Sequence, residues 1–230
     1  MSVLHGVAEI FFVVGFIFAF FVDHLPLSFR VLGFKLELFP ISTLRSTQIM
    51  ILNRFGAAFF FTTSGFLVDT GASVDDILFL FSVAWLTLGV VSFFYIRSWT
   101  SVARFLSKIV FGVNESDVKT SIVSVTWRDA LVNYPFFFNL AGISLPVLAA
   151  SVFPHYRATL MQAGFVFNSV ATLLLVFVIE PRFVSYISDK KGEQADHFHQ
   201  KLIFSKAIIL LTGGAGFLAL SAMCGAASLG

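Results

Sequence analysis

The chain has 230 residues, of which 57% are hydrophobic and only 12% are charged. An ordinary soluble domain is about 45–50% apolar and about 25% charged, and a soluble chain of this size cannot hide so much apolar surface. The composition therefore excludes a soluble domain, a disordered chain, a coiled coil and a disulfide scaffold, and it predicts an integral membrane protein. The net charge of +2 and the lack of a dense basic cluster indicate no nucleic-acid partner. The 31 phenylalanines favour a lipid-facing wall over a tightly packed core.

Six stretches are long and apolar enough to cross a membrane. A helix crosses about 30 Å of hydrocarbon with about 20 mainly apolar residues. The sequence therefore predicts an all-α, polytopic membrane protein, a bundle of six transmembrane helices that forms one domain over residues 1–230. The expected spans are residues 4–22, 48–68, 74–96, 130–153, 157–179 and 202–224.

Basic residues gather on one side of these spans. The loops after the first, third and fifth spans hold three, five and four Lys or Arg residues, whereas the loops on the other side hold Arg157 alone. Basic loops stay in the cytoplasm. We therefore expect both termini on the outer side of the membrane.

Two segments between the spans have distinct patterns. Residues 97–113 have apolar side chains at helical spacing, with basic side chains elsewhere, which predicts either an amphipathic helix on the inner leaflet or an extension of the third span. The apolar face consists of Trp99, Val102, Leu106, Ile109 and Val113. Residues 190–199 are polar and predict a solvated loop, so the pair His197 and His199 is not expected to bind a metal.

Arg54 stands out because it lies inside the second expected span. A charge at membrane depth costs at least about 2.5–3.5 kcal/mol, so it calls for a partner or a function. The side chain either snorkels to the headgroups or lines a hydrated cavity, with Asn53, and meets an anionic ligand. The small residues 56–58 that follow allow close helix contact or leave room for a ligand.

The segment that closes the first span mixes an acid, two bases and a proline with apolar residues. Arg30 and Lys35 suit phosphate oxygens, Arg as a fork and Lys as a mobile charge, and Asp23 and Ser28 lie beside them. The plainer interpretation is that the two bases only set the topology.

Further polar residues fall within the expected spans. Glu9 lies near the outer end of the first span, where it is either a protonatable coupling group or an interfacial carboxylate. The others predict a polar interior when taken together, although each alone is more typical of helix packing. They are Asn133, Asn139, Gln162 and Asn168.

Common catalytic motifs are missing from the sequence. It has no His-Glu-x-x-His, no Gly-x-Ser-x-Gly and no Walker loop. We therefore expect no catalytic residues, no bound metal and no cofactor. The glycines of residues 213–216 lie in mid-span and predict close helix packing.

Several of these motifs occur together in a known family. The chain resembles the Amj family, the alternate lipid II flippases of bacterial cell-wall synthesis, in three regions that follow one another in the same order. The first is Asp23-x-Leu25-x-x-Ser28-x-Arg30-x-x-Gly33-x-Lys35, and the second is Arg54 followed by Gly65-Phe66-Leu67-Val68-Asp69. The third is Arg157-Ala158-Thr159, Asn168-x-x-Ala171-Thr172 and Ile179-Glu180-Pro181-Arg182.

The resemblance implies a flippase in the bacterial cytoplasmic membrane. Its substrate would be an undecaprenyl-diphosphate-linked sugar, lipid II, moved from the inner to the outer leaflet. Arg54, Arg30 and Lys35 would hold the diphosphate, and Asn133, Asn139 and Gln162 would bind sugar hydroxyls. Outward movement of negative charge is downhill by about 2.3 kcal/mol per charge per 100 mV, so such a flippase needs no ATP.

Two other classes of function stay open at the level of sequence. One is a proton-coupled carrier or an inward undecaprenyl phosphate translocase, which would couple through a group such as Glu9. The other is a membrane-embedded enzyme acting on polyprenyl phosphates, for which the outer acids Asp69, Asp75 and Asp76 are the available cluster.

Overall fold

The computed structural model describes residues 2–113, 126, 129, 132–189 and 192–227. Most of these residues are helical and none of them lies in a strand, which confirms the expected all-α fold. Six of the helical stretches are long and apolar enough to span a membrane, as expected. The helices are α1 (Ser2–Val22), α2 (Leu25–Lys35), α3 (Phe39–Asp69), α4 (Val74–Arg97), α5 (Trp99–Phe111), α6 (Tyr134–Val152), α7 (Arg157–Leu174), α8 (Glu180–Ser188) and α9 (Gly192–Ala227).

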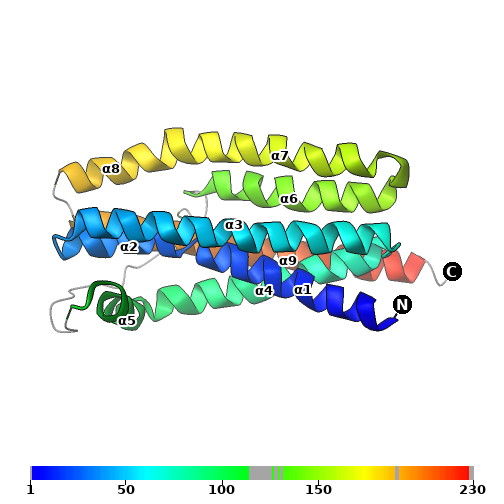
Figure 1. Cartoon of the computed structure of the whole chain (residues 1–230), viewed down its shortest axis with the longest axis horizontal. Helices are drawn as coiled ribbons and strands as arrows, with labels where there is room; N and C mark the ends of the chain where they lie inside the picture. Colours follow the sequence, from blue (N-terminus) through cyan, green and yellow to red (C-terminus); the bar gives the residue numbers. More distant parts are fainter. Residues whose placement is uncertain (1, 114–125, 127–128, 130–131, 190–191, 228–230) are drawn as a thin grey trace.

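The helices form an elongated bundle with two different ends (Figure 1). Both termini lie at one end, which we call the terminal end. Helices α2, α5 and α8 lie at the opposite end, which we call the basic end because these helices hold Arg30, Arg104 and Arg182. Within the bundle α4 packs along α9, α6 along α7, and α1 along α3.

Prolines mark where three of the helices begin. Pro26, Pro40 and Pro135 each occupy one of the first two positions of α2, α3 and α6. Proline is tolerated there because the first N–H groups of a helix have no intrahelical acceptor. Pro26 thus separates α2 from α1 by a turn at Asp23 and His24, although the two form one long apolar stretch.

The helices at the basic end extend beyond the expected spans. Helix α3 begins at Phe39 rather than near residue 48, and α9 begins at Gly192 rather than near residue 202. The prediction of a solvated loop over residues 190–199 is therefore wrong for the described residues 192–199. Ala195, Phe198 and Leu202 are buried at helical spacing, and this packing holds the segment as helix.

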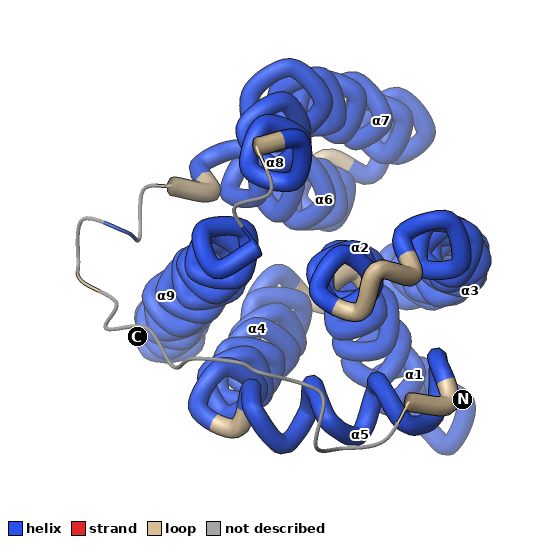
Figure 2. Tube along the Cα trace, turned by 90° about the vertical axis from the view of Figure 1, so that its left-hand side faces the viewer, coloured by secondary structure: helices blue, strands red, loops and turns tan. Residues whose placement is uncertain are grey.

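Helix α5 does not continue α4 in a straight line. Helix α4 ends at Arg97, Ser98 forms a turn, and α5 then crosses the bundle at the basic end, as Figure 2 shows from that end. Of the expected apolar face, Trp99 and Leu106 pack inward, whereas Ile109 is exposed.

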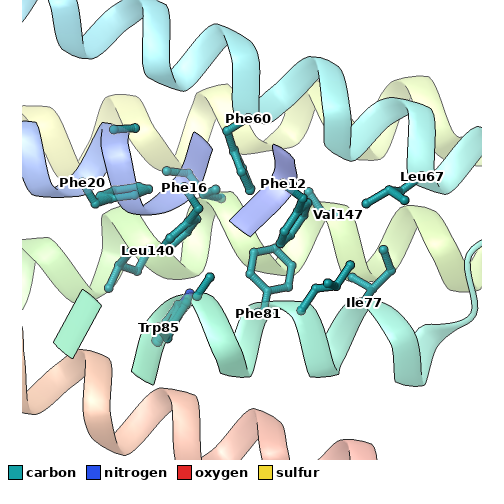
Figure 3. Close-up of a cluster of buried hydrophobic side chains, with 14 of the residues drawn as sticks. Phe12, Phe16, Phe20, Phe60, Leu67, Ile77, Phe81, Trp85, Leu140 and Val147 are labelled. Atoms are coloured by element: carbon teal, nitrogen blue, oxygen red, sulfur yellow. The ribbon is translucent and has the colours of Figure 1, made fainter. Parts of the chain in front are cut away.

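Two separate clusters of buried side chains hold the bundle together. The phenylalanine core occupies the half towards the terminal end and contains Phe12, Phe16, Phe60, Phe81 and Trp85 (Figure 3). The basic-end core includes Trp99 and residues of α2, α4, α5, α8 and α9. The preference expected for a lipid-facing wall over a packed core therefore does not hold for these phenylalanines, which fill the interior, while others such as Phe55 and Phe94 are exposed.

Small residues allow the helices of the phenylalanine core to approach closely. A Cβ at Gly213 would lie 2.2 Å from the ring of Trp85, and a Cβ at Gly56 would lie 3.1 Å from the Cα of Ala19. Gly213 thus packs α9 against α4, and Gly56 packs α3 against α1, which is the close-packing role expected of these glycines.

Candidate functional site

A connected set of buried polar side chains lies at the basic end, which we call the polar network. Ser28 of α2 is at its centre: its Oγ lies 2.8 Å from the hydroxyl of Tyr95 in α4 and 2.9 Å from Nε2 of His199 in α9. The Ser28 hydroxyl donates its own proton to the carbonyl of His24. Tyr95 and His199 must therefore be the donors to Ser28, because a serine hydroxyl carries one proton.

His24 continues the network towards the phenylalanine core. Its Nε2 lies 2.8 Å from Oγ of Ser92, whose proton goes to the carbonyl of Leu88. His24 is thus the donor to Ser92. The Nδ1 atoms of His24 and His199 are buried and have no hydrogen-bond partner within the described part of the chain. Both rings therefore present a free lone pair inside the protein.

Asp196 lies beside the polar network and accepts a second set of hydrogen bonds. Its carboxylate is fully buried and accepts hydrogen bonds from Nε1 of Trp99 at 2.7 Å and from Nζ of Lys35 at 2.5 Å. Gln200 also donates to it, at 3.4 Å. The Asp196 side chain is fully buried, whereas the Lys35 side chain keeps 14% of its surface exposed. The opposite charge and the further hydrogen bonds offset the cost of burying the carboxylate. The ring of Trp99 packs 4.5 Å from that of His199.

Two further ion pairs connect segments that lie far apart in the sequence. Arg30 of α2 donates to both oxygens of Glu180 in α8 at 2.8 Å, and its guanidinium lies 5.1 Å from the ring of Phe183. Lys206 of α9 donates to Asp23 at 2.6 Å. The expected site residues Asp23, Ser28, Arg30 and Lys35 are therefore each bonded to a different protein group, and no bond joins them to one another among the described residues.

A fourth ion pair has its carboxylate outside the membrane-spanning helices. Lys201 contacts Asp129 at 2.9 Å, and Thr126 donates to the same carboxylate. Burial raises the pKa of Asp129, but the bonds from Lys201 and Thr126 outweigh it and leave the pKa below its ordinary value. This pair holds Asp129 against α9.

Arg54 is not part of the polar network. It lies fifteen residues from either end of α3, or about 22 Å at 1.5 Å per residue, and its side chain is on the exposed surface. It has no hydrogen bond or ion pair with any residue that the structure describes. Asn53 beside it is half-buried. Arg54 is thus an unpaired cation on the outside of a membrane-spanning helix.

The expected polar interior is divided between two helices. Asn133 is buried next to α9, donates to Ser205 from its backbone N–H and to Leu202 from its side chain, and leaves Oδ1 without a described partner. Asn139 is half-buried on α6 and Gln162 is exposed on α7. The side chain of Asn168, on α7, lies outside the described residues. The described members do not converge with Arg54 on one site.

Glu9 lies in a pocket of 760 Å³ near the terminal end, between α1 and α3. It contacts His5 at 3.6 Å, and Phe66 and Asp69 line the other side. Asp69 also contacts Arg157 at 3.4 Å.

The remaining outer acids have a structural role. Asp76 forms a capping box with Ser73 that begins α4, and Asp75 is in the same first turn. Among the described residues, no three His, Cys, Asp or Glu side chains lie close enough together to hold a metal ion.

Sequence reasoning missed His24, Trp99, Asp196 and His199 as members of a common site. The helical spacing of Ala195, Phe198 and Leu202 was the available signal, because it places the residues between them on a packed helix. Comparison of the chain with models of protein families, with curated proteins and with solved structures finds no match.

Proposed function

We propose that the protein is a flippase that moves a polyprenyl-diphosphate-linked cell-wall precursor, lipid II, from the inner to the outer leaflet of a bacterial cytoplasmic membrane. The observation that carries the proposal is the exposed guanidinium of Arg54, halfway along a membrane-spanning helix and without a partner among the described residues. Such a charge is costly unless it meets an anion, and Arg binds phosphate oxygens as a bidentate fork. The resemblance to the Amj family supports the same function.

The packing around Arg54 favours a lipid-linked substrate over a soluble one. The interior of this half of the bundle is filled by the phenylalanine core, whereas Phe55 and Phe59 beside Arg54 are exposed. A headgroup that moves along the outside of α3 leaves its polyprenyl tail in lipid throughout. A carrier for soluble ions needs a polar path through the interior, and an enzyme needs a cluster of acids. Both alternatives therefore have less support.

In this proposal, Arg30 and Lys35 exchange their carboxylate partners for the diphosphate of the substrate. Each holds a carboxylate, Glu180 or Asp196, and a diphosphate offers oxygens of the same charge. The positive-inside rule assigns the basic end to the cytoplasm, which is where the substrate is loaded. Substrate binding would release α2 from α8 and α9, and the membrane potential would favour outward passage of the headgroup.

Rescue of a bacterium depleted of its essential lipid II flippase tests the proposal, with labelling of lipid II exposed at the outer surface as the direct measurement. We expect the wild-type chain to restore growth and labelling, and Arg54→Ala to abolish both. Arg45→Ala is the matched control, since it also removes an exposed arginine from α3, and it should rescue. Failure of the inserted wild-type chain to restore labelling would disprove the flippase proposal, and full activity of Arg54→Ala would remove Arg54 from the site.

A further inference from the structure

Helix α5 has one face that the packing of the protein leaves unexplained. Its inner face is held by Trp99, which donates to Asp196, and by the buried Ala103 and Leu106. The outer face carries two exposed basic side chains one turn apart, Arg104 and Lys108. Two like charges at this spacing destabilise a helix unless an anion lies between them.

An apolar strip runs beside the two basic residues. Phe105 is 61% exposed and Ile109 is 65% exposed, and they too lie one turn apart. Together with Ser101, the basic and apolar strips line a pocket of 480 Å³ on the surface of α5. The pocket thus offers charge and hydroxyl donors on one side and apolar contact on the other.

No internal anion neutralises this pocket in the described part of the chain. Arg30, Lys35, Lys201 and Lys206 at the same end each contact a carboxylate. Arg104 and Lys108 have no ion pair or hydrogen bond to any described residue. The countercharge must therefore come from outside these residues.

We infer that the outer face of α5 binds the phosphate headgroup of an anionic phospholipid, with Arg104, Lys108 and Ser101 on the phosphate and with Phe105 and Ile109 against the acyl chain. The position of α5 suits this ligand. It begins where α4, a membrane-spanning helix, ends, and it crosses the bundle there, as a helix lying in the interface does (Figure 2). A free phosphate ion would use the basic strip alone and leave the apolar strip unoccupied. The site is independent of the proposed flippase activity.

Binding of phosphatidylglycerol to the purified protein tests the inference, with phosphatidylcholine as the uncharged comparison and native mass spectrometry as the measurement. We expect the wild-type protein to retain a phosphatidylglycerol molecule. The variant Arg104→Gln/Lys108→Gln should bind this lipid with an affinity at least tenfold weaker than wild type. The matched control Arg45→Gln/Arg182→Gln removes the same charge from two other exposed sites and should keep the lipid. Equal loss in both double variants would overturn the site in favour of general charge attraction.

A second variant separates a lipid from a free anion. Phe105→Ser/Ile109→Ser keeps both basic residues and should weaken phosphatidylglycerol binding while leaving displacement by inorganic phosphate unchanged. Unaltered lipid binding in this variant would overturn the lipid as ligand and leave only an anion site. Equal thermal unfolding temperatures for all the variants show that folding is not the cause of any loss.

Discussion

The two halves of the bundle bury their side chains in different ways. The phenylalanine core is held by aromatic contacts, with ring centroids of Phe12 and Phe81 5.0 Å apart and those of Phe16 and Phe60 5.3 Å apart. The basic-end core combines apolar packing with the polar network and its ion pairs. Shape complementarity selects the partners in the first half, whereas hydrogen-bond geometry selects them in the second.

The difference shows where movement is to be expected. Aromatic packing between close helices gives one well-defined arrangement and little reason to change. Ion pairs between helices can exchange their carboxylate for another anion, and the Arg30 and Lys35 pairs both join α2 to a later helix. We therefore expect substrate-driven change at the basic end and a rigid frame in the half that contains the phenylalanine core.

Loss of the buried carboxylate should have the largest effect on stability. Asp196→Ala removes the carboxylate that faces the Lys35 ammonium and leaves the buried Trp99 N–H without its acceptor, so we expect the free energy of unfolding to fall by about 3–5 kcal/mol. Thermal unfolding in detergent, followed by tryptophan fluorescence, measures the change. The double variant Lys35→Met/Asp196→Leu removes both charges and should recover most of the loss. A single variant as stable as wild type would show that the network does not hold this end together.

A substitution at a close helix contact of the phenylalanine core should have a smaller effect on the free energy of unfolding. A Cβ at Gly213 would lie 2.2 Å from the Trp85 ring, so Gly213→Ala should lower the free energy of unfolding by about 1–3 kcal/mol through overpacking. Gly216 has no atom within 4 Å of its would-be Cβ. Gly216→Ala should therefore leave stability unchanged or raise it by up to about 1 kcal/mol through helix propensity. The same unfolding measurement compares them, and equal effects would contradict the packing described for α4 and α9.

Loss of the half-exposed ion pair between Arg30 and Glu180 should have the smallest effect on the free energy of unfolding. The Glu180 side chain is 43% exposed, against 0% for Asp196, so water screens its bond with Arg30. We expect Glu180→Ala to lower the free energy of unfolding by about 1 kcal/mol or less, with less effect at high salt. A loss as large as that of Asp196→Ala, unaffected by salt, would remove the distinction between the two pairs.

The six spans could be predicted because an apolar run of about 20 residues is rare outside membrane-spanning helices. The helix of residues 192–199 could not be recognised from polarity alone, because its polar residues are buried against partners on other helices. A hydropathy profile scores each charged residue as polar, whether or not it has a partner. It therefore cannot show that Asp196 is buried in an ion pair with Lys35. The turn between α4 and α5 likewise depends on the docking of Trp99.

The candidate site could be predicted only in part for the same reason. The grouping of Arg30 and Lys35 follows from their closeness in the chain, but their partners Glu180 and Asp196 are 150 and 161 positions away. A single sequence contains no information on such pairs. The position of Arg54 in a span was predictable, whereas its exposure depends on which face of α3 packs against α1.

Reconstitution of the purified protein in liposomes with a fluorescent polyprenyl-diphosphate-linked sugar tests the central claim most directly. Quenching by a membrane-impermeant reductant reports how fast the headgroup crosses the bilayer. The proposal predicts rapid crossing with the wild-type protein and with Arg45→Ala, and a rate close to that of empty liposomes with Arg54→Ala. Crossing by Arg54→Ala at the wild-type rate would contradict the claim that this guanidinium binds the diphosphate.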